Sequence, residues 1–307
     1  MASYNSSSTE RPMPQDTVAR QAERMAQALL ENGPGRLEQE PNTPRLQGSP
    51  AKSGLQLVIW GPSSSGKTAL LAQLYLENFD EEGDWIITSN EANDEALKFI
   101  KIMRDKRGNN LFPVANTAND VAQLSYTFNH RTTGISATLL VEDRPGQHYQ
   151  AQREEIRERL AAADGLVLLV DPEREPRLID DELSSLFTQM HADRRASSPQ
   201  DPRPIAVCLS KADILIDSPA DLRHACGSPD DFVSVHDHWG LSRLFNRYSA
   251  NYRFFPVSAA GVELIFGIAL PNIFYDENLT VRVKGKSHSF NFMDPFDWLI
   301  GELSYRP

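Results

Sequence analysis

The feature that most constrains the fold of this chain is a glycine-rich octapeptide between an apolar run and a helical pattern. Gly61–Thr68 reads G-P-S-S-S-G-K-T and fits the pattern G-x-x-x-x-G-K-[ST] without a mismatch. Leu57–Trp60 leads into it as a buried strand would, and a run of leucines from Leu70 follows at helical spacing. Glycines allow backbone N–H groups to point into one concavity, and the positive end of the following helix also attracts anions. The sequence therefore predicts a phosphate-binding loop between a strand and a helix.

Two side chains of this loop carry the expected chemistry. Lys67 should reach the β- and γ-phosphates of a nucleoside triphosphate, and the Thr68 hydroxyl should bind Mg2+. The alternative, a chance match within a serine-rich loop, is disfavoured by the strand before it and the helix after it. The motif predicts a nucleoside triphosphate with Mg2+, but it does not identify the base. The expected phosphate-binding residues are Gly61, Pro62, Ser63, Ser64, Ser65, Gly66, Lys67 and Thr68.

From Leu55 onward, short apolar runs alternate with longer amphipathic stretches. Strands separated by helices form βαβ units, which build a mostly parallel sheet covered on both faces. We therefore predict an α/β fold, a P-loop NTPase domain with a mostly parallel central sheet flanked by helices. The predicted strands are Leu55–Trp60, Val121–Asn129, Ala137–Glu142, Gly165–Val170, Ile205–Leu209 and Phe254–Val257, and the predicted helices are Thr68–Asn78, Asp94–Arg107, Gln150–Ala163 and Leu178–Arg194.

Residues 1–53 differ in composition from the rest of the chain. Gly33–Gly35 and Asn42–Pro44 are turn-forming segments, and we expect a flexible, largely disordered arm. Within it, Thr17–Leu30 carries alanines and leucines at helical spacing. This segment is either a transient helix in a disordered arm or a docking helix that folds on a partner.

Charge and composition narrow the range of partners. The formal net charge of −11 argues against general affinity for nucleic acid or anionic membranes, because those surfaces are polyanions. No apolar stretch near the N-terminus resembles a signal peptide, and the apolar run Leu166–Val170 is far too short to span a bilayer. Cys208 and Cys226 match neither a zinc site nor a disulfide framework, and we expect Cys208 to be a buried thiol. The sequence predicts a soluble, cytoplasmic protein.

Three later segments each follow a predicted strand. Leu139–Gln147 reads L-L-V-E-D-R-P-G-Q, Ile205–Asp213 reads I-A-V-C-L-S-K-A-D, and Phe254–Gly261 reads F-F-P-V-S-A-A-G. Each match is weak alone, since strand ends commonly carry such residues. In this order, and after Gly61–Thr68, they resemble the D-x-x-G, N-K-x-D and S-A-x motifs of the TRAFAC-type, Ras-like GTPases. The resemblance implies a Ras-like G domain with insertions that binds GTP or GDP with Mg2+.

The resemblance implies roles for the residues around Asp143. Asp143 would hold Mg2+ through a water molecule, and the Gly146 N–H would sense the γ-phosphate. Gln147 would orient the attacking water. Arg144 lies inside the same turn, and it would either stabilise the transition state as an arginine finger or pair with an acid of Arg153–Glu155.

The resemblance also assigns the recognition of guanine. Asp213 would accept hydrogen bonds from the N1–H and the exocyclic amine of the base, while the stem of Lys211 packs on it. Adenine lacks these donors, and a buried carboxylate left unpaired costs about 1–3 kcal/mol or more. The loop at Ser258 and Ala259 would offer a backbone N–H to the guanine carbonyl. Ser210 departs from the family's Asn, which implies the loss of some side-chain bridging to the phosphate loop.

The GTPase resemblance requires a threonine that meets Mg2+ and the γ-phosphate. The interval from Thr68 to Asp143 is much longer than in a minimal Ras-like domain, and it offers several candidates. We favour Thr117, which lies just before the second predicted strand, over Thr88 and Thr132.

The segments Pro113–Thr117 and Asp143–Gly146 resemble the outline of the bacterial double-GTPase and GTPase-associated families. This resemblance implies one GTPase domain over residues 54–307. It would hydrolyse GTP slowly and act as a nucleotide-dependent switch with a protein effector or regulator, within a bacterial conflict or signalling system. Two alternatives stay open: a pseudo-GTPase scaffold without turnover, and a P-loop ATPase or kinase. Asp213 distinguishes the last of these, because an adenine site does not need it.

Three further segments carry weaker signals. His236–His238 is either a metal cluster or a polar loop, and the absence of partner ligands at a suitable spacing favours the loop. Asn272–Phe292 predicts a β-hairpin with a turn at Lys284–Lys286, and Pro295–Leu303 predicts a short closing helix.

Overall fold

A seven-stranded sheet with the order β2-β3-β4-β1-β5-β6-β7 forms the centre of the molecule. The five strands from β4 to β7 in this order are parallel, β3 is antiparallel to β4, and β2 is antiparallel to β3. The predicted α/β fold with a mostly parallel sheet is thus confirmed. The strands are β1 (Leu55–Trp60), β2 (Trp85–Ser89), β3 (Ala122–His130), β4 (Ser136–Asp143), β5 (Gly165–Val170), β6 (Asp201–Leu209) and β7 (Ser249–Pro256). The computed structural model describes residues 54–62, 64–77, 85–89, 122–131, 134–143, 153–194, 198, 200–278, 281–284 and 289–304.

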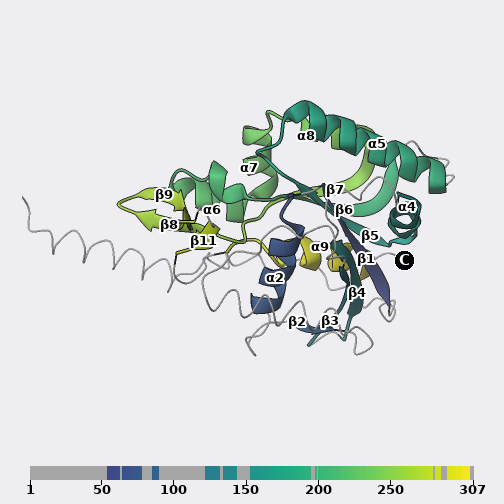
Figure 1. The fold of residues 1–307 in the computed structure, drawn as a ribbon. Coiled ribbons are helices and arrows are strands. Elements are labelled where there is room, and N and C mark those ends of the chain that lie inside the picture. The colour runs from purple at the N-terminus through teal and green to yellow at the C-terminus, as the bar shows by residue number, and fades with distance from the viewer. Residues whose placement is uncertain are drawn as a thin grey trace, which may run out of the picture.

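Helices cover both faces of this sheet (Figure 1). α2 and α9 pack on one face, while α5 and α8 pack on the other. Successive residues of the central strands point into two separate cores: Leu57 lies in the core beneath α2, and Val58 lies in the core beneath α5. Both faces of the central strands are therefore buried, as parallel sheets require. The helices are α2 (Lys67–Glu77), α4 (Arg153–Ala162), α5 (Pro176–Arg194), the 3-10 helix η2 (Ala212–Leu215), α6 (Pro219–Gly227), α7 (Pro229–His236), α8 (Leu241–Tyr248) and α9 (Asp294–Ser304).

The elements near the phosphate-binding loop agree best with the sequence-based predictions. β1 and β5 have the predicted bounds, whereas β7 begins at Ser249 rather than at Phe254. The helices α6, α7 and α8 were not predicted, because elements of eight or nine residues are too short to show a repeated apolar face. The helices predicted at Thr17–Leu30 and Asp94–Arg107 lie outside the described residues.

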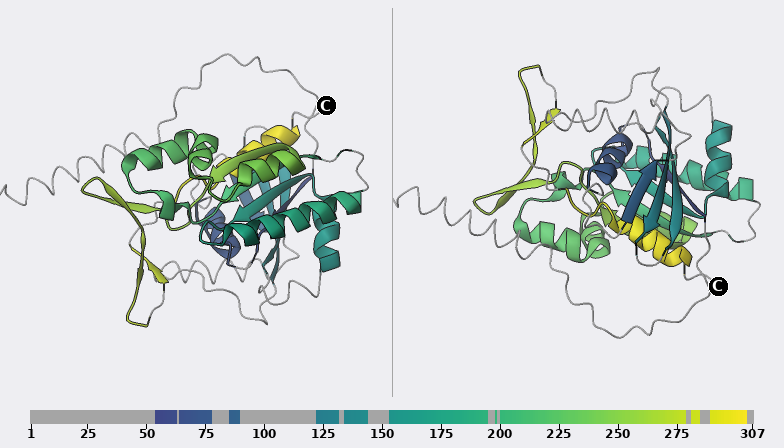
Figure 2. Two further views of the ribbon diagram at one scale, coloured as in Figure 1. Left: turned by 90° about the horizontal axis from the view of Figure 1, so that it is seen from above. Right: turned by 90° about the horizontal axis from the view of Figure 1, so that it is seen from below.

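Two hairpins project from the body of the domain after β7 (Figure 2). They are β8 (Val262–Ile265) with β9 (Ile268–Pro271), and β10 (Ile273–Tyr275) with β11 (Val281–Val283). A hairpin exists within the predicted segment Asn272–Phe292, and it pairs Ile273–Tyr275 with Val281–Val283. The predicted turn at Lys284–Lys286 is not the turn of this hairpin, and of its residues only Lys284 lies within the described part of the chain. The chain turns between Tyr275 and Val281 instead, where the Asp276 carboxylate accepts bonds from the Asn278 N–H at 2.9 Å and from Arg282 Nε at 2.7 Å.

The closing helix α9 packs under the half of the sheet that carries the phosphate-binding loop. Phe296, Leu299 and Ile300 are buried as predicted, and the ring of Phe296 stacks on Phe128 of β3 with centroids 5.4 Å apart. A Cβ on Gly165 would lie 3.2 Å from Leu303 and 3.3 Å from Leu299, so this glycine permits the close approach. Helix α9 is therefore an integral part of the fold.

Two further sequence-based predictions concern single residues and membrane segments. Cys208 is fully buried in β6 as predicted, and burial raises the pKa of its thiol far above the ordinary value. Within the part of the chain that the structure describes, no helix is both long enough and apolar enough to cross a membrane.

Candidate functional site

The segments that the sequence analysis identified meet at the edge of the sheet where the parallel strands have their carboxyl ends. Gly61 follows β1, Ser210 follows β6 and Val257 follows β7, while Asp143 is the last residue of β4. Because these strands are parallel, their carboxyl ends lie side by side. Ligands of open α/β sheets bind at this edge. The fold therefore brings together residues from four separate parts of the sequence.

The backbone of the glycine-rich loop bends sharply at two of its described residues. Ser64 and Gly66 have φ angles of 64° and 85°, in the left-handed region. A Cβ on Gly61 would lie 2.5 Å from Ser65 Oγ and 2.9 Å from Leu169 Cβ, so only glycine fits there. The Lys67 ammonium, at the start of α2, donates to the carbonyl oxygens of Gly61 and Pro62, each at 2.8 Å. The loop thus folds around the lysine and holds it at the base of the concavity.

The loop fits a phosphate group. The side chain of Ser65 is fully buried, and its hydroxyl is one of the few buried polar atoms in the described residues that have no hydrogen-bond partner. Such a hydroxyl is costly unless a ligand satisfies it. Thr68, the second residue of α2, is partly exposed in the first helical turn. An oxygen-rich anion at this helix N-terminus would satisfy both the hydroxyl and the helix dipole.

The residues after β6 are held by two acids that were not predicted from the sequence. Lys211 has a left-handed backbone with φ 52°, and its ammonium lies 2.8 Å from Asp171 Oδ2 and 2.8 Å from Glu173 Oε2. Burial lowers the pKa of Lys211, but hydrogen bonds and charge from the two carboxylates outweigh this and raise it overall. Asp171 follows the fully buried strand β5 directly, and a carboxylate in that position is a signal that sequence reasoning missed.

Asp213 is a buried carboxylate positioned by the loop after β7. It accepts a hydrogen bond from the hydroxyl of Ser258, and that hydroxyl accepts one from the Gly261 N–H at 2.9 Å. Burial raises the pKa of Asp213, while the hydrogen bond from Ser258 works in the opposite direction. We predicted only a backbone role for Ser258, but its side chain joins the two loops. A further bond, from the Ala212 N–H to the Val257 carbonyl at 3.1 Å, reinforces this junction.

Ser210 is bound to the sheet and packs beside the glycine-rich loop. Its hydroxyl donates to the Val170 carbonyl at 3.0 Å. A Cβ on Gly66 would lie 3.7 Å from Ser210 Cβ, which is an ordinary contact. The small side chain therefore allows the loop to lie close to the end of β6.

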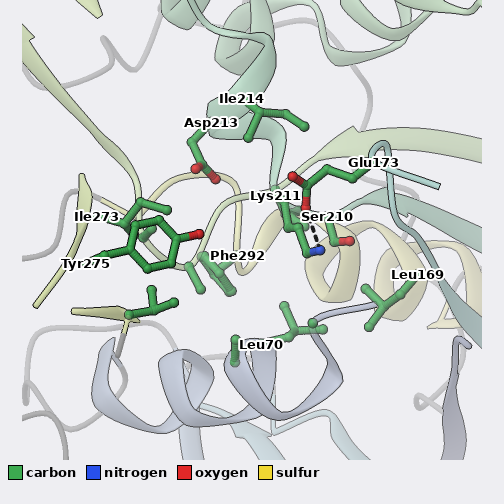
Figure 3. A pocket seen from close by; sticks show the side chains of 16 residues that line it. Leu70, Leu169, Glu173, Ser210, Lys211, Asp213, Ile214, Ile273, Tyr275 and Phe292 are labelled. Carbon is green, nitrogen blue, oxygen red and sulfur yellow. Dashed lines mark hydrogen bonds and ion pairs between the residues drawn. The ribbon is translucent and has the colours of Figure 1, made fainter. Parts of the chain in front are cut away.

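A cavity of about 260 Å³ lies between these loops (Figure 3). Its walls come from the glycine-rich loop and the start of α2, from the segments after β5, β6 and β7, and from the hairpin β10–β11. Asp213 and Lys211 both line it, and the carboxylate of Asp213 points into it. The cavity thus connects the phosphate-binding loop to a buried hydrogen-bond acceptor.

Several predicted site residues lie outside the described part of the chain: Ser63, Thr117, Arg144, Gly146 and Gln147. The backbone around them is informative, because Ala122 at the start of β3 pairs with Asp143 at the end of β4. The chain therefore enters β3 at the edge of the sheet that carries the loop.

Of the two other threonine candidates, Thr88 is described, and Thr132 lies outside the described residues. Thr88 lies inside the edge strand β2, where it pairs with Thr127. Arg131 and Gly134, which flank Thr132, lie at the opposite edge of the sheet, where the Gly134 N–H bonds the His130 carbonyl at 3.1 Å. The start of β3 thus lies at the end of the sheet that carries the glycine-rich loop, and the end of β3 lies at the opposite end.

The alternative metal interpretation of His236–His238 gains no support. Asp237 caps α8, because its carboxylate accepts bonds from the backbone N–H groups of Leu241 at 2.7 Å and Ser242 at 2.9 Å. Among the residues that the structure describes, no group of three or more His, Cys, Asp or Glu side chains is arranged to hold a metal ion.

A glycine-rich loop between β1 and α2, at the carboxyl edge of a parallel sheet, defines a P-loop nucleotide-binding domain. The chain belongs to the family Double-GTPase 2, whose model matches residues 57–226. The domain is therefore a GTP-binding domain, and the ligand implied by the family is a guanine nucleotide.

A solved structure also matches this chain, namely the GTPase-like domain of Ski7 from S. cerevisiae bound to GTP. The identity is 14%, the match covers 84% of this chain and 51% of that chain, and the TM-score is 0.41. The match therefore spans about half of the length of the chain in that structure. No curated protein matches the sequence.

Proposed function

We propose that this protein binds GTP with Mg2+, hydrolyses GTP, and acts as a nucleotide-dependent switch. The observation that carries the proposal is the placement of Asp213. This buried carboxylate lines a cavity that begins at the phosphate-binding loop, and Ser258 holds it in position. The site therefore combines an anion-binding loop with a fixed acceptor for the base.

Asp213 would select guanine. Its carboxylate accepts hydrogen bonds from the N1–H and the exocyclic amine of guanine, and adenine offers no such pair of donors. A buried acceptor that faces adenine would lose about 1–3 kcal/mol. Lys211 has its ammonium held by Asp171 and Glu173, so its stem is fixed along the cavity wall. An apolar stem along this wall can pack against the flat face of a base.

The phosphates would lie in the glycine-rich loop. Lys67 supplies a positive charge at the base of the concavity, and the buried Ser65 hydroxyl supplies a donor. Thr68, Asp143 and Thr117 are the proposed ligands of Mg2+, with Asp143 acting through water, and the ion would neutralise charge on the phosphate oxygens. The placement of Asp143 at the end of β4 supports its part in this set.

Hydrolysis would use residues just after β4. We propose that Gln147 orients the attacking water and that the Gly146 N–H contacts the γ-phosphate, with Arg144 as a candidate for stabilising charge in the transition state. Loss of the γ-phosphate would then release Gly146 and Thr117, which is the basis of the switch. Intrinsic rates are low in this class, so we propose a protein effector or regulator.

We further propose that the GTPase domain extends over residues 54–307, with residues 1–53 as an arm. The packing of α9 beneath β3 and β5 supports the far boundary. A role in a bacterial conflict or signalling system and a cytoplasmic location remain predictions.

The test is calorimetric binding in the presence of Mg2+, with GTPγS, GDP and ATPγS as ligands. We expect the wild type to bind the guanine nucleotides and to discriminate against ATPγS. In Asp213→Asn, the amide would repel the exocyclic amine of guanine but pair with the carbonyl that xanthine carries in the same place. This variant should therefore lose about tenfold or more in affinity for GDP and bind xanthosine diphosphate better than the wild type does.

Other outcomes would select other functions. Equal binding of ATPγS and GTPγS by the wild type would support an ATPase. Binding of GTP without turnover, in single-turnover assays with and without Mg2+, would support a scaffold. If the Asp213→Asn variant keeps the base preference of the wild type, Asp213 does not recognise the base.

A further inference from the structure

The hairpin β10–β11 contributes side chains to the wall of the nucleotide cavity. Ile273, Tyr275 and Val281 line the same cavity as Asp213 and Lys211. Phe274, between the first two, does not line it. Alternate residues of a strand point to opposite faces, so the hairpin turns one face to the cavity and the other away from it. The hairpin face is apolar and aromatic, as expected of a surface that contacts a flat base.

Tyr275 lies where the cavity opens to solvent. The residue is 64% exposed although it lines the cavity, and its hydroxyl points toward the middle of the cavity (Figure 3). An exposed aromatic ring at the mouth of a pocket loses this exposure when a ligand fills the pocket. Aromatic rings stack on all bases, because every base has a π-face.

The hairpin is tied to the loop that positions Asp213. Asn272 is 1% exposed, its N–H donates to the Gly261 carbonyl at 3.0 Å, and its side-chain amide donates to the Ala260 carbonyl at 3.3 Å. On the other strand, the Lys284 N–H donates to the Asn272 carbonyl at 3.1 Å. The base of the hairpin is therefore anchored through Asn272 to the loop that carries Ser258, which ties the position of Tyr275 to that loop.

We infer that β10–β11 is the outer wall of the base site and that the ring of Tyr275 packs against the bound guanine. This inference rests on the proposed function. It adds a contact from the far end of the domain, outside residues 57–226 that the family model matches. The affinity for the guanine base would then depend on a hairpin that lies outside the phosphate-binding motifs.

The test compares variants of neighbouring residues on one strand, using calorimetry with GDP and Mg2+. Tyr275→Ala should weaken GDP binding about tenfold, because a base–aromatic contact is lost. Tyr275→Phe should stay within about twofold of the wild type, since it keeps the ring. Phe274→Ala is the matched control. Phe274 is 40% exposed and does not line the cavity, so the same strand loses an aromatic ring and GDP binding should not change.

A base-free ligand separates a contact with the base from a general effect on the site. Ribose 5-diphosphate should bind the wild type and Tyr275→Ala equally, because it keeps the phosphates and lacks the base. Ile273→Ala gives a second measurement on the same face and should also weaken GDP alone. Circular dichroism melts of each variant check the fold, and the substitutions at the exposed residues Phe274 and Tyr275 should leave it intact.

These experiments distinguish a failure of the hairpin inference from a failure of the proposed function. If the wild type binds GDP and Tyr275→Ala binds it within twofold, the hairpin inference is overturned while the proposed function stands. An equal loss in Phe274→Ala, or an equal loss for ribose 5-diphosphate, also overturns it. A wild type that binds no guanine nucleotide overturns the proposed function, and the inference about the base falls with it.

Discussion

Ser258 donates its hydroxyl hydrogen to the carboxylate of Asp213, which lies 45 positions earlier in the chain and after the neighbouring strand. This bond connects two loops that are short and unremarkable as sequence motifs. Both partners are buried, so the bond is not weakened by exchange with bulk water. The orientation of the proposed guanine acceptor thus depends on a serine side chain, and the predictions begin from this pair.

Ser258→Ala should weaken GDP binding while leaving phosphate binding intact. The buried carboxylate loses a donor worth roughly 1 kcal/mol, and the expected loss of affinity is about fivefold to tenfold. Ser249→Ala is the control, because Ser249 is a buried serine at the start of β7, at the opposite edge of the sheet. Calorimetry measures the affinity of both variants for GDP. Equal losses of affinity in the two variants would show that Ser258 contributes only to the stability of the protein.

Asp213 should make the ligand-free protein sensitive to pH. Burial raises the pKa of this carboxyl above its ordinary value of 3.8, so its ionised form is disfavoured in the folded state. The unfolded chain ionises more easily, and the folded state therefore loses stability as pH rises through the raised pKa. Asp213→Asn should melt higher than the wild type at pH 7, and this gain should vanish below about pH 4, the pKa expected for the unfolded chain. A gain that persists at pH 3 would show that charge is not its cause.

Gly61→Ala should disrupt the phosphate-binding loop. The added Cβ would lie 2.5 Å from Ser65 Oγ and 2.9 Å from Leu169 Cβ, so the loop must shift. Overpacking of this kind costs about 1–3 kcal/mol, and binding of GDP should fall at least tenfold. Gly301→Ala in α9 is the control, since its Cβ would meet no atom within 4 Å and alanine favours a helix. Thermal melts and GDP titrations of both variants check this, and similar results for the two would contradict it.

Lys211→Met should destabilise the protein more than Glu173→Gln. Methionine keeps an apolar stem but leaves Asp171, whose side chain is 4% exposed, without its cationic partner. An unpaired buried carboxylate costs about 1–3 kcal/mol or more. Glu173 is 57% exposed, and the loss of an exposed ion pair costs about 0–1 kcal/mol. Urea unfolding of both variants measures the difference, and equal free energies of unfolding would contradict the ranking.

Prediction from the sequence worked where local patterns determine structure. The apolar run before Gly61 and the fully buried run Gly165–Val170 are strands with the predicted bounds, because such runs are typical of central parallel strands. Parallel strands also align their carboxyl ends, which is why the loops after β1, β6 and β7 could be expected at one edge.

The contacts that complete the site are non-local, and the sequence does not show them. Asp171 and Lys211 meet only because β5 and β6 are neighbours, and the side-chain role of Ser258 depends on the turn after β7. The glycine of Lys284–Lys286 suggested a turn there, whereas the turn of hairpin β10–β11 follows Tyr275, where the Asp276 carboxylate accepts a hydrogen bond from the Asn278 N–H. Tyr275 gave no sequence signal, since its place at the cavity follows from that turn.

The packing of α9 has a consequence for the order in which the protein is made. Phe296, Leu299 and Leu303 belong to the same core as Leu57 and Leu71, which flank the glycine-rich loop. A ribosome synthesises the loop early and α9 late, so the core beneath the loop stays incomplete until almost all of the domain has been translated. A nascent chain that has reached only Cys226 carries every residue that the family model matches, yet it lacks the helix on which the sheet rests. We therefore expect firm nucleotide binding only after α9 has been made and has packed on the sheet.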